Sequence, residues 1–284
     1  MLRTPGVDGL GDVIRALREW QHDGGPMQLH PGDLGWYWRF GPEATAGATR
    51  TWSREGRILA VGHVDSSSVR LAIAPDAWDD EPLAQEMAHD VTHSERGVLP
   101  SGDGCVEARW DGRFQELLPK DRWEPAEPWA PLSRVLREPV EQCGVRIEVI
   151  GPDCAHERTA VQRAAFDGST FTDERWRMMA TGLPYADARC LVAYDDRGVA
   201  VAAATVWSAG RGKPGLLEPL GVHREHRGHG FGTAMAVAAA AALQEIGSSS
   251  AIVCTPSSNA AAVATYRSAG FRELPAVRGL RRIA

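Results

Sequence analysis

The sequence has few cysteines and no long apolar run. Its 5 cysteines among 284 residues show no Cys-x-x-Cys spacing, so the pattern indicates neither a zinc ribbon nor a disulfide framework. An odd, scattered set of thiols is typical of the reducing cytoplasm, where we expect the protein to reside. The longest apolar stretch, residues 234–243, is too short and too rich in alanine to span a bilayer, and we expect no signal peptide and no membrane partner.

Two common nucleotide-binding signatures are missing as well. The glycine-rich stretch at residues 221–233 has no Gly-Lys-Ser/Thr ending, so it lacks the lysine and the hydroxyl group that a nucleoside-triphosphate loop uses. A dinucleotide fingerprint would need a third glycine where Thr233 or Met235 stands. The stretch therefore fits neither of these two ligand classes.

Positive charge is scarce in the first half of the chain. Residues 1–143 contain 15 Lys and Arg against 24 Asp and Glu, a balance of −9, whereas residues 144–284 contain 16 against 13, a balance of +3. The acidic half would repel nucleic acid, and neither half has a strip of arginine and aromatic residues, so we expect no nucleic-acid partner. The basic half suits a polyphosphate ligand.

The glycine-rich stretch has the features of an anion site. Gly228, Gly230 and Gly232 leave successive backbone N–H groups uncovered at the start of a helix expected over residues 231–245. The helix dipole and Arg227 both favour a negative ligand there, and a diphosphate fits best. The alternative is a glycine-rich turn that only connects a strand to a helix.

A second helix is expected at residues 259–270. Ser258 or Asn259 can cap its start, and Gly270 stands where a left-handed residue ends a helix. Asn259 and Tyr266 are seven residues apart and so share one face, with the small Ala262 between them. Tyr266 could also be an amphipathic side chain that merely closes this face.

Together, the pattern Arg227-Gly-x-Gly-x-Gly232 and the later Asn259-x-x-Ala-x-x-x-Tyr266-x-x-x-Gly-Phe271 resemble the two signatures of the GNAT family of N-acetyltransferases. The resemblance extends over about residues 145–284. It implies acetyl-coenzyme A as co-substrate, no metal, and attack of an amine on the thioester within a ternary complex. It also implies that Tyr266 protonates the departing thiolate. The residues expected to bind the coenzyme are Leu220, Gly221, Val222, Arg227, Gly228, His229, Gly230, Phe231, Gly232, Thr233 and Asn259.

The general base is expected on or near the central strand, residues 216–222. Glu218 is the first candidate, because the family often places a carboxylate there, although an ion pair that holds the strand is an equal alternative. His223 is the second, and simple exposure at the strand end suits it too. The spacing of His223, His226 and His229 could suggest zinc, but these residues fall in variable positions of a loop already committed to phosphate, so we expect no metal.

The remaining pattern predicts an α/β (α+β) fold. Strands are expected at residues 145–150, 190–194, 199–207 and 250–254, and helices at 155–166 and 173–180, the second capped by Thr172. Pro219 cannot donate a ladder hydrogen bond, so a bulge is expected in the central strand. We expect a closing hairpin at residues 271–283, a strand at residues 34–40, and a proline-rich linker at residues 118–140 that contains Trp123 and Trp129.

The first half repeats the pattern of the second. The segments that begin at Trp52 and Tyr194 have the same strand, turn and strand pattern at an offset of 142 residues, which indicates an internal duplication. At the positions of the cofactor loop the first copy has Trp78, Asp79, Glu81 and Leu83, whose side chains would fill the anion site and repel a diphosphate. We therefore expect a degenerate GNAT-like domain at residues 1–140 and a catalytic one at residues 141–284. Each should be a mixed, mostly antiparallel twisted sheet flanked by helices, with a splayed central strand in the second.

The acceptor stays open at this stage. Fold and cofactor do not define it, and small-molecule or peptide amines all fit. The acidic first half and its tryptophans favour a cationic acceptor, whereas the alternative role for the tryptophans is core packing. A non-catalytic coenzyme A-binding regulator and an acyltransferase for another acyl group are the alternative functions. A succinyl group would need a cation such as Arg211 or Lys213. Monomer and homodimer remain equally open.

Overall fold

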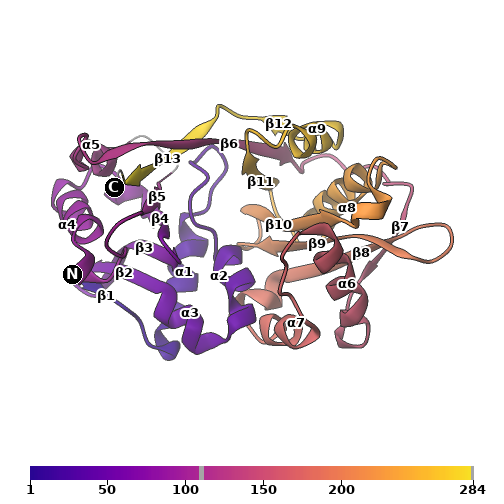
Figure 1. Ribbon diagram of the computed structural model, residues 1–284, viewed down its shortest axis with the longest axis horizontal. Coiled ribbons are helices and arrows are strands. Elements are labelled where there is room, and N and C mark those ends of the chain that lie inside the picture. The colour runs from indigo at the N-terminus through magenta and orange to yellow at the C-terminus, as the bar shows by residue number, and fades with distance from the viewer. Residues whose placement is uncertain (109–111, 283–284) are drawn as a thin grey trace.

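The protein is described by a computed structural model in which residues 1–108 and 112–282 are placed. Within these ranges every strand belongs to one mixed sheet, with helices on both faces (Figure 1). The strand order is β1-β2-β3-β4-β5-β13-β6-β11-β10-β9-β8-β7, and β12 pairs with β6 beside this path. The predicted fold class is therefore confirmed.

The first half of the chain supplies the following elements: β1 (Leu2–Arg3), α1 (Leu10–Trp20), α2 (Pro31–Tyr37), α3 (Pro42–Ala48), β2 (Thr49–Arg54), β3 (Arg57–Asp65), β4 (Ser68–Ile73), α4 (Glu81–Thr92), β5 (Cys105–Glu107), α5 (Arg113–Leu117) and β6 (Trp123–Val135). The second half supplies β7 (Arg146–Val149), α6 (Ala155–Ala165), α7 (Asp173–Ala180), β8 (Ala188–Tyr194), β9 (Ala200–Ser208), β10 (Pro214–Val222), α8 (Phe231–Glu245), β11 (Ser250–Pro256), α9 (Ala260–Ser268), β12 (Arg272–Glu273) and β13 (Val277–Arg282). Short 3₁₀ turns join several of them.

The two halves repeat one topology. In the first, β2, β3 and β4 are antiparallel, α4 follows, and β5 returns parallel to β4. In the second, β8, β9 and β10 are antiparallel, α8 follows, and β11 returns parallel to β10. The duplication inferred from the 142-residue offset is thus present in the order and direction of the strands.

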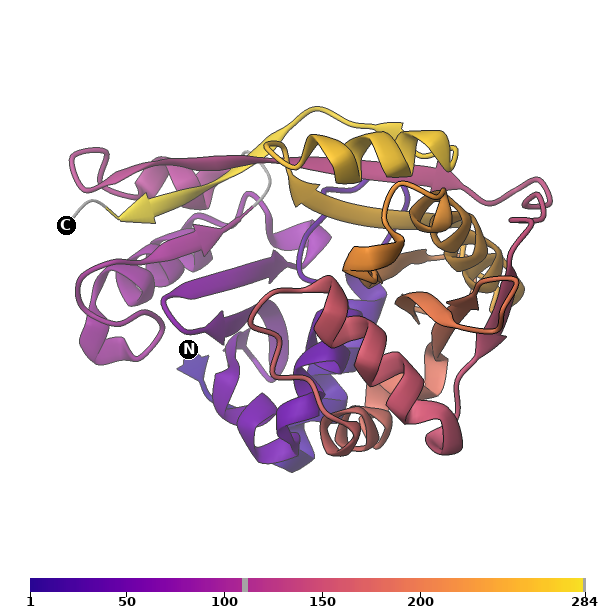
Figure 2. The same cartoon turned by 45° about the vertical axis from the view of Figure 1, so that its right-hand side comes forward.

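Each half completes its sheet with a strand from the other half. The start of β6 pairs with β13, and its end, from Trp129 to Val135, pairs with β11 (Figure 2). The other edge of β13 pairs with β5, where Leu280 faces Val106. The last described strand of the chain therefore lies among strands of the first half.

Two sequence expectations are wrong at this point. The proline-rich stretch expected as a linker forms β6, because prolines lack an N–H group but keep a carbonyl that accepts: Ser257 N–H donates to Pro128 O and Leu274 N–H to Pro131 O, both at 2.9 Å. The closing hairpin is wrong as well, because β12 and β13 both pair with β6 rather than with each other. Its last expected residue, Ile283, lies outside the described residues.

The strand expected at residues 34–40 is instead α2 followed by a 3₁₀ turn. Pro31 stands in the first turn, where a missing N–H is harmless. His30 and Asp33 then form a capping box: the His30 ring accepts from Gly32 N–H at 2.9 Å, and His30 N–H donates to Asp33 at 2.7 Å. These local hydrogen bonds outweigh the preference of the following aromatic residues for a strand.

Helix α2 joins the two halves. A Cβ atom added at Gly32 would lie 2.5 Å from Trp207 Cβ, and one at Gly35 would lie 2.4 Å from Trp207 Cζ3. The helix backbone therefore rests directly on the buried indole ring of β9. Trp36 stacks on Phe171 of the second half, with ring centroids 5.3 Å apart.

The second half buries both faces of its sheet. Along β8, Leu191 and Ala193 belong to the core under α8, whereas Cys190 and Val192 belong to the core under α6 and α7. This alternation is the period of a strand covered on both sides. The small side chains of the alanine-rich α8 bring its first turn close to the end of β10, where the candidate site lies.

Substitution of Gly279 by alanine should destabilise the protein by disturbing the pairing of β13, from the second half, with β5 of the first half. The new Cβ would meet the backbone oxygen of Val106 at 2.4 Å, so β13 must move away from β5 at a cost of about 1–3 kcal/mol. Urea titration would measure the loss in the free energy of unfolding. The matched control is Gly47→Ala in α3, where a Cβ meets no atom within 4 Å, so its stability should be unchanged or slightly raised. Equal effects of the two variants would contradict the exchange.

Candidate active site

The central strand opens away from its parallel neighbour. β10 and β11 pair only from Pro214 to Leu216, and the pairing of β10 with β9 shifts between Leu217 and Leu220. The bulge expected at Pro219 is therefore present. Trp207 Nε1–H donates to the Glu218 carbonyl at 2.7 Å and so satisfies a backbone group that the bulge removes from the ladder. A cavity of about 290 Å³ occupies the opening.

The start of α8 presents uncovered backbone. Gly228 and Gly230 have φ angles of 82° and 83°, a left-handed conformation that side chains disfavour. Gly230 is the N-cap of α8, and no side chain caps this helix. The first N–H groups of a helix have no partner within it, so those of α8 are available to a ligand. They face a second cavity of about 560 Å³.

Helix α9 lies between the two cavities. Asn259 accepts from Ala262 N–H at 3.2 Å through its side-chain oxygen, which confirms the expected N-cap. Asn259 and Tyr266 line both cavities, and the Tyr266 side chain is otherwise buried. Burial raises the pKa of the Tyr266 hydroxyl well above its usual range, and the Glu218 carboxylate raises it further. Tyr266 therefore keeps its proton at neutral pH.

Most of the expected coenzyme residues converge on the larger cavity. Arg227 is among them, although one of its N–H groups is already committed to the Ala165 carbonyl at 2.8 Å, at the end of α6. Gly221 must lack a side chain, because a Cβ there would lie 2.6 Å from Ala165 Cβ. The expected residues that line this cavity are Leu220, Gly221, Val222, Arg227, Gly228, Gly230, Phe231, Gly232, Thr233 and Asn259.

Two expected residues are not brought to these cavities. His229 is exposed and its Nδ1 lies 2.9 Å from the Arg227 carbonyl. His223 lines a separate surface cavity of about 590 Å³, where its ring accepts from Glu225 N–H at 3.3 Å. Of the two base candidates, only Glu218 shares a cavity with Tyr266.

The cations considered for a succinyl group also lie elsewhere. Lys213 donates to the Glu19 and Gln21 carbonyls, both at 3.1 Å, and so links the two halves. Neither Lys213 nor Arg211 lines the cavity at β10. Over residues 1–108 and 112–282, no three His, Cys, Asp or Glu side chains are grouped as metal ligands. The same ranges contain no helix with the length and apolar character needed to cross a membrane.

The first half adds residues around Glu218 that the motifs did not indicate. A fourth cavity, of about 170 Å³, shares Asp33, Arg70 and Glu218 with the opening at β10. Arg70 Nε donates to Glu107 at 2.9 Å, Arg70 Nη1 contacts Asp33, and the same Nη1 lies 3.8 Å from Glu218. One sequence signal could have found this cluster: Arg70 interrupts the apolar strand Val69–Ile73. The other first-half residues that line the cavity are Trp36, Tyr37, Arg39, His63, Asp65 and Ser68.

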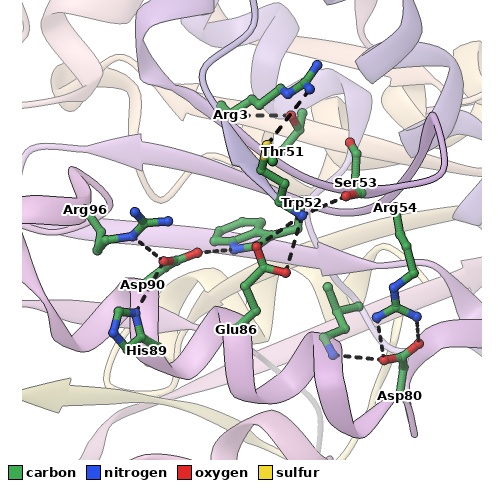
Figure 3. A network of polar contacts seen from close by, with 12 residues as sticks. Arg3, Thr51, Trp52, Ser53, Arg54, Asp80, Glu86, His89, Asp90 and Arg96 are labelled. Atoms are coloured by element: carbon green, nitrogen blue, oxygen red, sulfur yellow. Dashed lines mark hydrogen bonds and ion pairs between the residues drawn. The ribbon is translucent and has the colours of Figure 1, made fainter.

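In the first half, a carboxylate fills the position that α8 leaves bare. Asp80 is the N-cap of α4 and accepts from Leu83 N–H at 2.8 Å (Figure 3). Arg54 donates to both Asp80 oxygens, at 2.6 and 2.9 Å. Trp78 turns inward to the Ile73 carbonyl, and Glu81 pairs with Arg113. At the start of α4, the carboxylate of Asp80 thus occupies the place that a bound anion could take.

Comparison with protein families agrees with this geometry. Residues 156–271 match the model of the Acetyltransferase (GNAT) family. This part of the chain is therefore a GNAT domain, from a family that transfers acyl groups from acyl-coenzyme A. Comparison with curated proteins gives no match.

The whole chain has the fold of tandem GNAT proteins. A tandem GNAT protein from the clavulanic acid biosynthesis pathway is similar over 99% of this chain and 97% of its own, with a TM-score of 0.61 and 14% identity. A GCN5-related N-acetyltransferase from Sphaerobacter thermophilus is similar over 99% of this chain and 94% of its own, with a TM-score of 0.60 and 17% identity. A GNAT-family acetyltransferase from Colwellia psychrerythraea is similar over 99% of this chain and 98% of its own, with a TM-score of 0.60 and 14% identity. At these identities the likeness concerns the fold.

Replacement of Asp80 by alanine should lower the free energy of unfolding by about 1 kcal/mol at neutral pH, through loss of the cap. The Arg54 hydrogen bonds hold the pKa of Asp80 below its ordinary value of 3.8. Its contribution is therefore complete above that value and disappears as the pH falls through the lower folded-state pKa. Urea titrations across this pH range would measure the difference. Asp79→Ala, which removes an exposed carboxylate next door, is the control; an equal loss in that variant would argue against the cap.

Proposed function

We propose that the protein is an N-acetyltransferase that moves an acetyl group from acetyl-coenzyme A to an amine. The observation that carries this proposal is the continuity of three features: the uncapped start of α8, the opening between β10 and β11, and the presence of both Tyr266 and Glu218 in the lining of that opening. The coenzyme diphosphate would accept from the first N–H groups of α8. Its pantetheine arm would run along Leu220 to Val222 and past the Asn259 amide group.

Tyr266 is the proposed general acid. When the amine nitrogen bonds to the acetyl carbon, the carbon–sulfur bond breaks and charge develops on the sulfur. Tyr266 carries its proton at neutral pH, as any phenol of ordinary pKa does, and its position in the opening would let it give that proton to the leaving thiolate. Burial and Glu218 raise its pKa, which keeps the phenol neutral but does not make it a stronger acid.

Glu218 is the proposed general base. The attacking amine must lose a proton, and the Glu218 carboxylate lies in the cavity that also contains Tyr266. The same carboxylate reaches the smaller cavity of the first half, from which an amine could approach. The proton passes from the amine to Glu218, directly or through water, so that the products are the amide and the thiol of coenzyme A. His223 has no part in this scheme, because it lines another cavity.

The alternative of a non-catalytic coenzyme A-binding regulator keeps the site at α8 but gives Tyr266 no role. The burial of a protonated phenol beside a carboxylate favours the catalytic proposal. A different acyl group, such as succinyl, receives no support from Arg211 or Lys213. Acetyl is therefore the proposed group.

A carboxylate at the N-cap of α8 should block the coenzyme. Gly230→Asp would place a carboxylate at the N-cap of α8, as Asp80 does in α4 although on an extended rather than a left-handed backbone, and this charge would repel the diphosphate. Gly230→Asn has nearly the same size and backbone demands without the charge. We expect the Kd for acetyl-coenzyme A, measured by calorimetry, to rise at least about tenfold more in the aspartate than in the asparagine variant. Equal Kd values in the two variants would show that the diphosphate does not bind at the start of α8.

Removal of the Tyr266 hydroxyl should separate catalysis from binding. In Tyr266→Phe we expect kcat to fall about 100- to 10,000-fold, since the general acid is lost, while the Kd for acetyl-coenzyme A stays the same. Release of the coenzyme A thiol in the presence of an amine measures kcat. Tyr194→Phe removes a phenol of β8 that contacts Glu157 of α6 and should leave kcat unchanged. Binding without thiol release in the unaltered protein, for any amine tried, would favour the regulator.

A further inference from the structure

A fifth cavity, of about 720 Å³, lies at the junction of the halves. One side is formed by residues 21–27, which follow α1, and the other mainly by side chains of β6, β11 and β12. Met27 and Ile252 line both this cavity and the opening at β10, so the two spaces adjoin. Pockets for drug-sized ligands typically have volumes of about 300–1,000 Å³. The cavity therefore has room for an acceptor larger than a simple amine.

The floor of this cavity is a row of paired residues that begins beside the opening. Leu216 of β10 lies opposite Ile252 of β11. Ile252 is also opposite Ser133 of β6, which in turn is opposite Arg272 of β12, and directly paired side chains project from the same face of a sheet. Three strand spacings of about 4.8 Å separate β10 from β12, about 14 Å in all. Arg272 is thus at the far end of the row from the strand that carries Glu218.

The cavity contains two arginines whose charge no carboxylate balances. Arg137 and Arg272 are exposed side chains in its lining, and neither makes a hydrogen bond or an ion pair with a residue of the described ranges, 1–108 and 112–282. Asp23, the carboxylate of the described lining, accepts instead from the Ser250 hydroxyl at 2.7 Å. The planar fork of an arginine matches the geometry of a carboxylate. A carboxylate of a ligand would therefore find a cation in this wall.

Residues 21–27 are held beside the strands of the second half. Ser250 Oγ donates to Asp23 at one point of contact. At another, Lys213 Nζ donates to the carbonyls of Glu19 and Gln21, both at 3.1 Å. These hydrogen bonds keep one wall of the cavity close to the row of paired residues, so that the cavity is part of the folded junction.

The cavity of about 170 Å³ meets the same opening but offers no comparable charge. Its Arg70 already contacts Asp33, Glu107 and Glu218. Its volume is also below that of typical pockets for drug-sized ligands. An acceptor with an anionic group therefore fits the larger cavity better.

We propose that the acceptor occupies the cavity of about 720 Å³ and carries a carboxylate that binds Arg272 while its amine reaches Glu218. The inference rests on the proposed function and names the class of its acceptor: an amine joined to a carboxylate by a spacer of several atoms. The length of the row requires the spacer, because an α-amino acid holds both groups on one carbon. The nitrogen–carbon bond forms as the carbon–sulfur bond breaks, the amine proton passes to Glu218, and the sulfur takes the proton of Tyr266.

This acceptor differs from the cationic one expected from the net charge of residues 1–143. That balance sums over the whole first half, whereas the described lining of the cavity contains Asp23 as its single Asp or Glu. Exposed charges more than about 8–10 Å apart are largely screened at physiological salt. The lining of the cavity therefore decides which charge of a ligand is favoured.

The test compares triglycine with triglycinamide, two peptides of equal length of which only the first ends in a carboxylate. Three extended residues span about 10 Å, and the Arg272 side chain covers the rest of the row. Release of the coenzyme A thiol gives kcat and KM for each peptide. We expect the KM of triglycine to be at least about tenfold lower than that of triglycinamide, since the amide lacks the charge-assisted hydrogen bond.

Two variants test the position of each part of the peptide. Arg272→Gln should raise the KM of triglycine about 10- to 100-fold with kcat unchanged, and that of triglycinamide less than about threefold. The matched control is Arg278→Gln: Arg278 follows Val277 on β13, points to the opposite face and donates to the Ala126 carbonyl at 3.0 Å, so neither KM should change. Ser133→Trp, which places an indole within the row, should raise the KM of both peptides while the rise of Tm with acetyl-coenzyme A stays the same.

Several results would overturn the inference. Equal KM values for the two peptides in the unaltered protein, or an equal rise of both in Arg272→Gln, would exclude a carboxylate at Arg272. Unchanged KM values in Ser133→Trp would place the acceptor in another cavity. Release of no thiol with either peptide, by a protein whose Tm rises with acetyl-coenzyme A, would reject this class of acceptor and leave the cofactor site intact. A protein whose Tm does not rise with acetyl-coenzyme A would instead reject the proposed function, and this inference with it.

Discussion

Each half of this protein completes its part of the sheet with a strand from the other half. β6 begins beside β13 and ends beside β11, and β13 in turn covers β5, so the two copies of one topology share a single continuous sheet. Tyr266 belongs to the second half, whereas Asp33 and Arg70 belong to the first, and all three line the same cavity. The shared sheet and the packing of α2 on Trp207 bring the two halves together at this point.

The two copies use the same position, the start of the helix that follows the third antiparallel strand, in different ways. At the start of α4, Asp80 uses its carboxylate to satisfy the helix, and Arg54 balances the charge. At the start of α8, Gly230 leaves the equivalent N–H groups to a ligand. A helix end has to find partners for these groups in either case. The first copy satisfies its helix start with a side chain of its own, whereas the second has no side-chain cap there.

Much of the second half was predictable because its signals are local. Gly230 and Gly270 adopt left-handed conformations at helix ends, Thr172 and Asn259 cap the helices that follow them, and the proline in β10 marks a bulge. Each of these features depends on a few neighbouring residues. The resemblance of the cofactor loop to the GNAT signature rests on the same local chemistry.

The parts that could not be predicted depend on distant partners. The prolines of β6 look like a linker until β11 and β13 are placed beside their carbonyls. The aromatic run after Pro31 looks like a strand until the capping box is recognised. The first-half residues that line the cavity of about 170 Å³ are spread from Asp33 to Glu107, and their spacing follows no motif, because the fold alone brings them to Glu218.

The Trp207 side chain contacts both the central strand of the second half and helix α2 of the first half. One edge of its indole holds the carbonyl of Glu218, and its face supports the bare backbone of α2 at Gly32 and Gly35. Helix α2 of the first half and the carbonyl of Glu218 in the second therefore contact the same side chain. A larger or smaller residue at position 207 would change the packing of the halves and the shape of the bulge together.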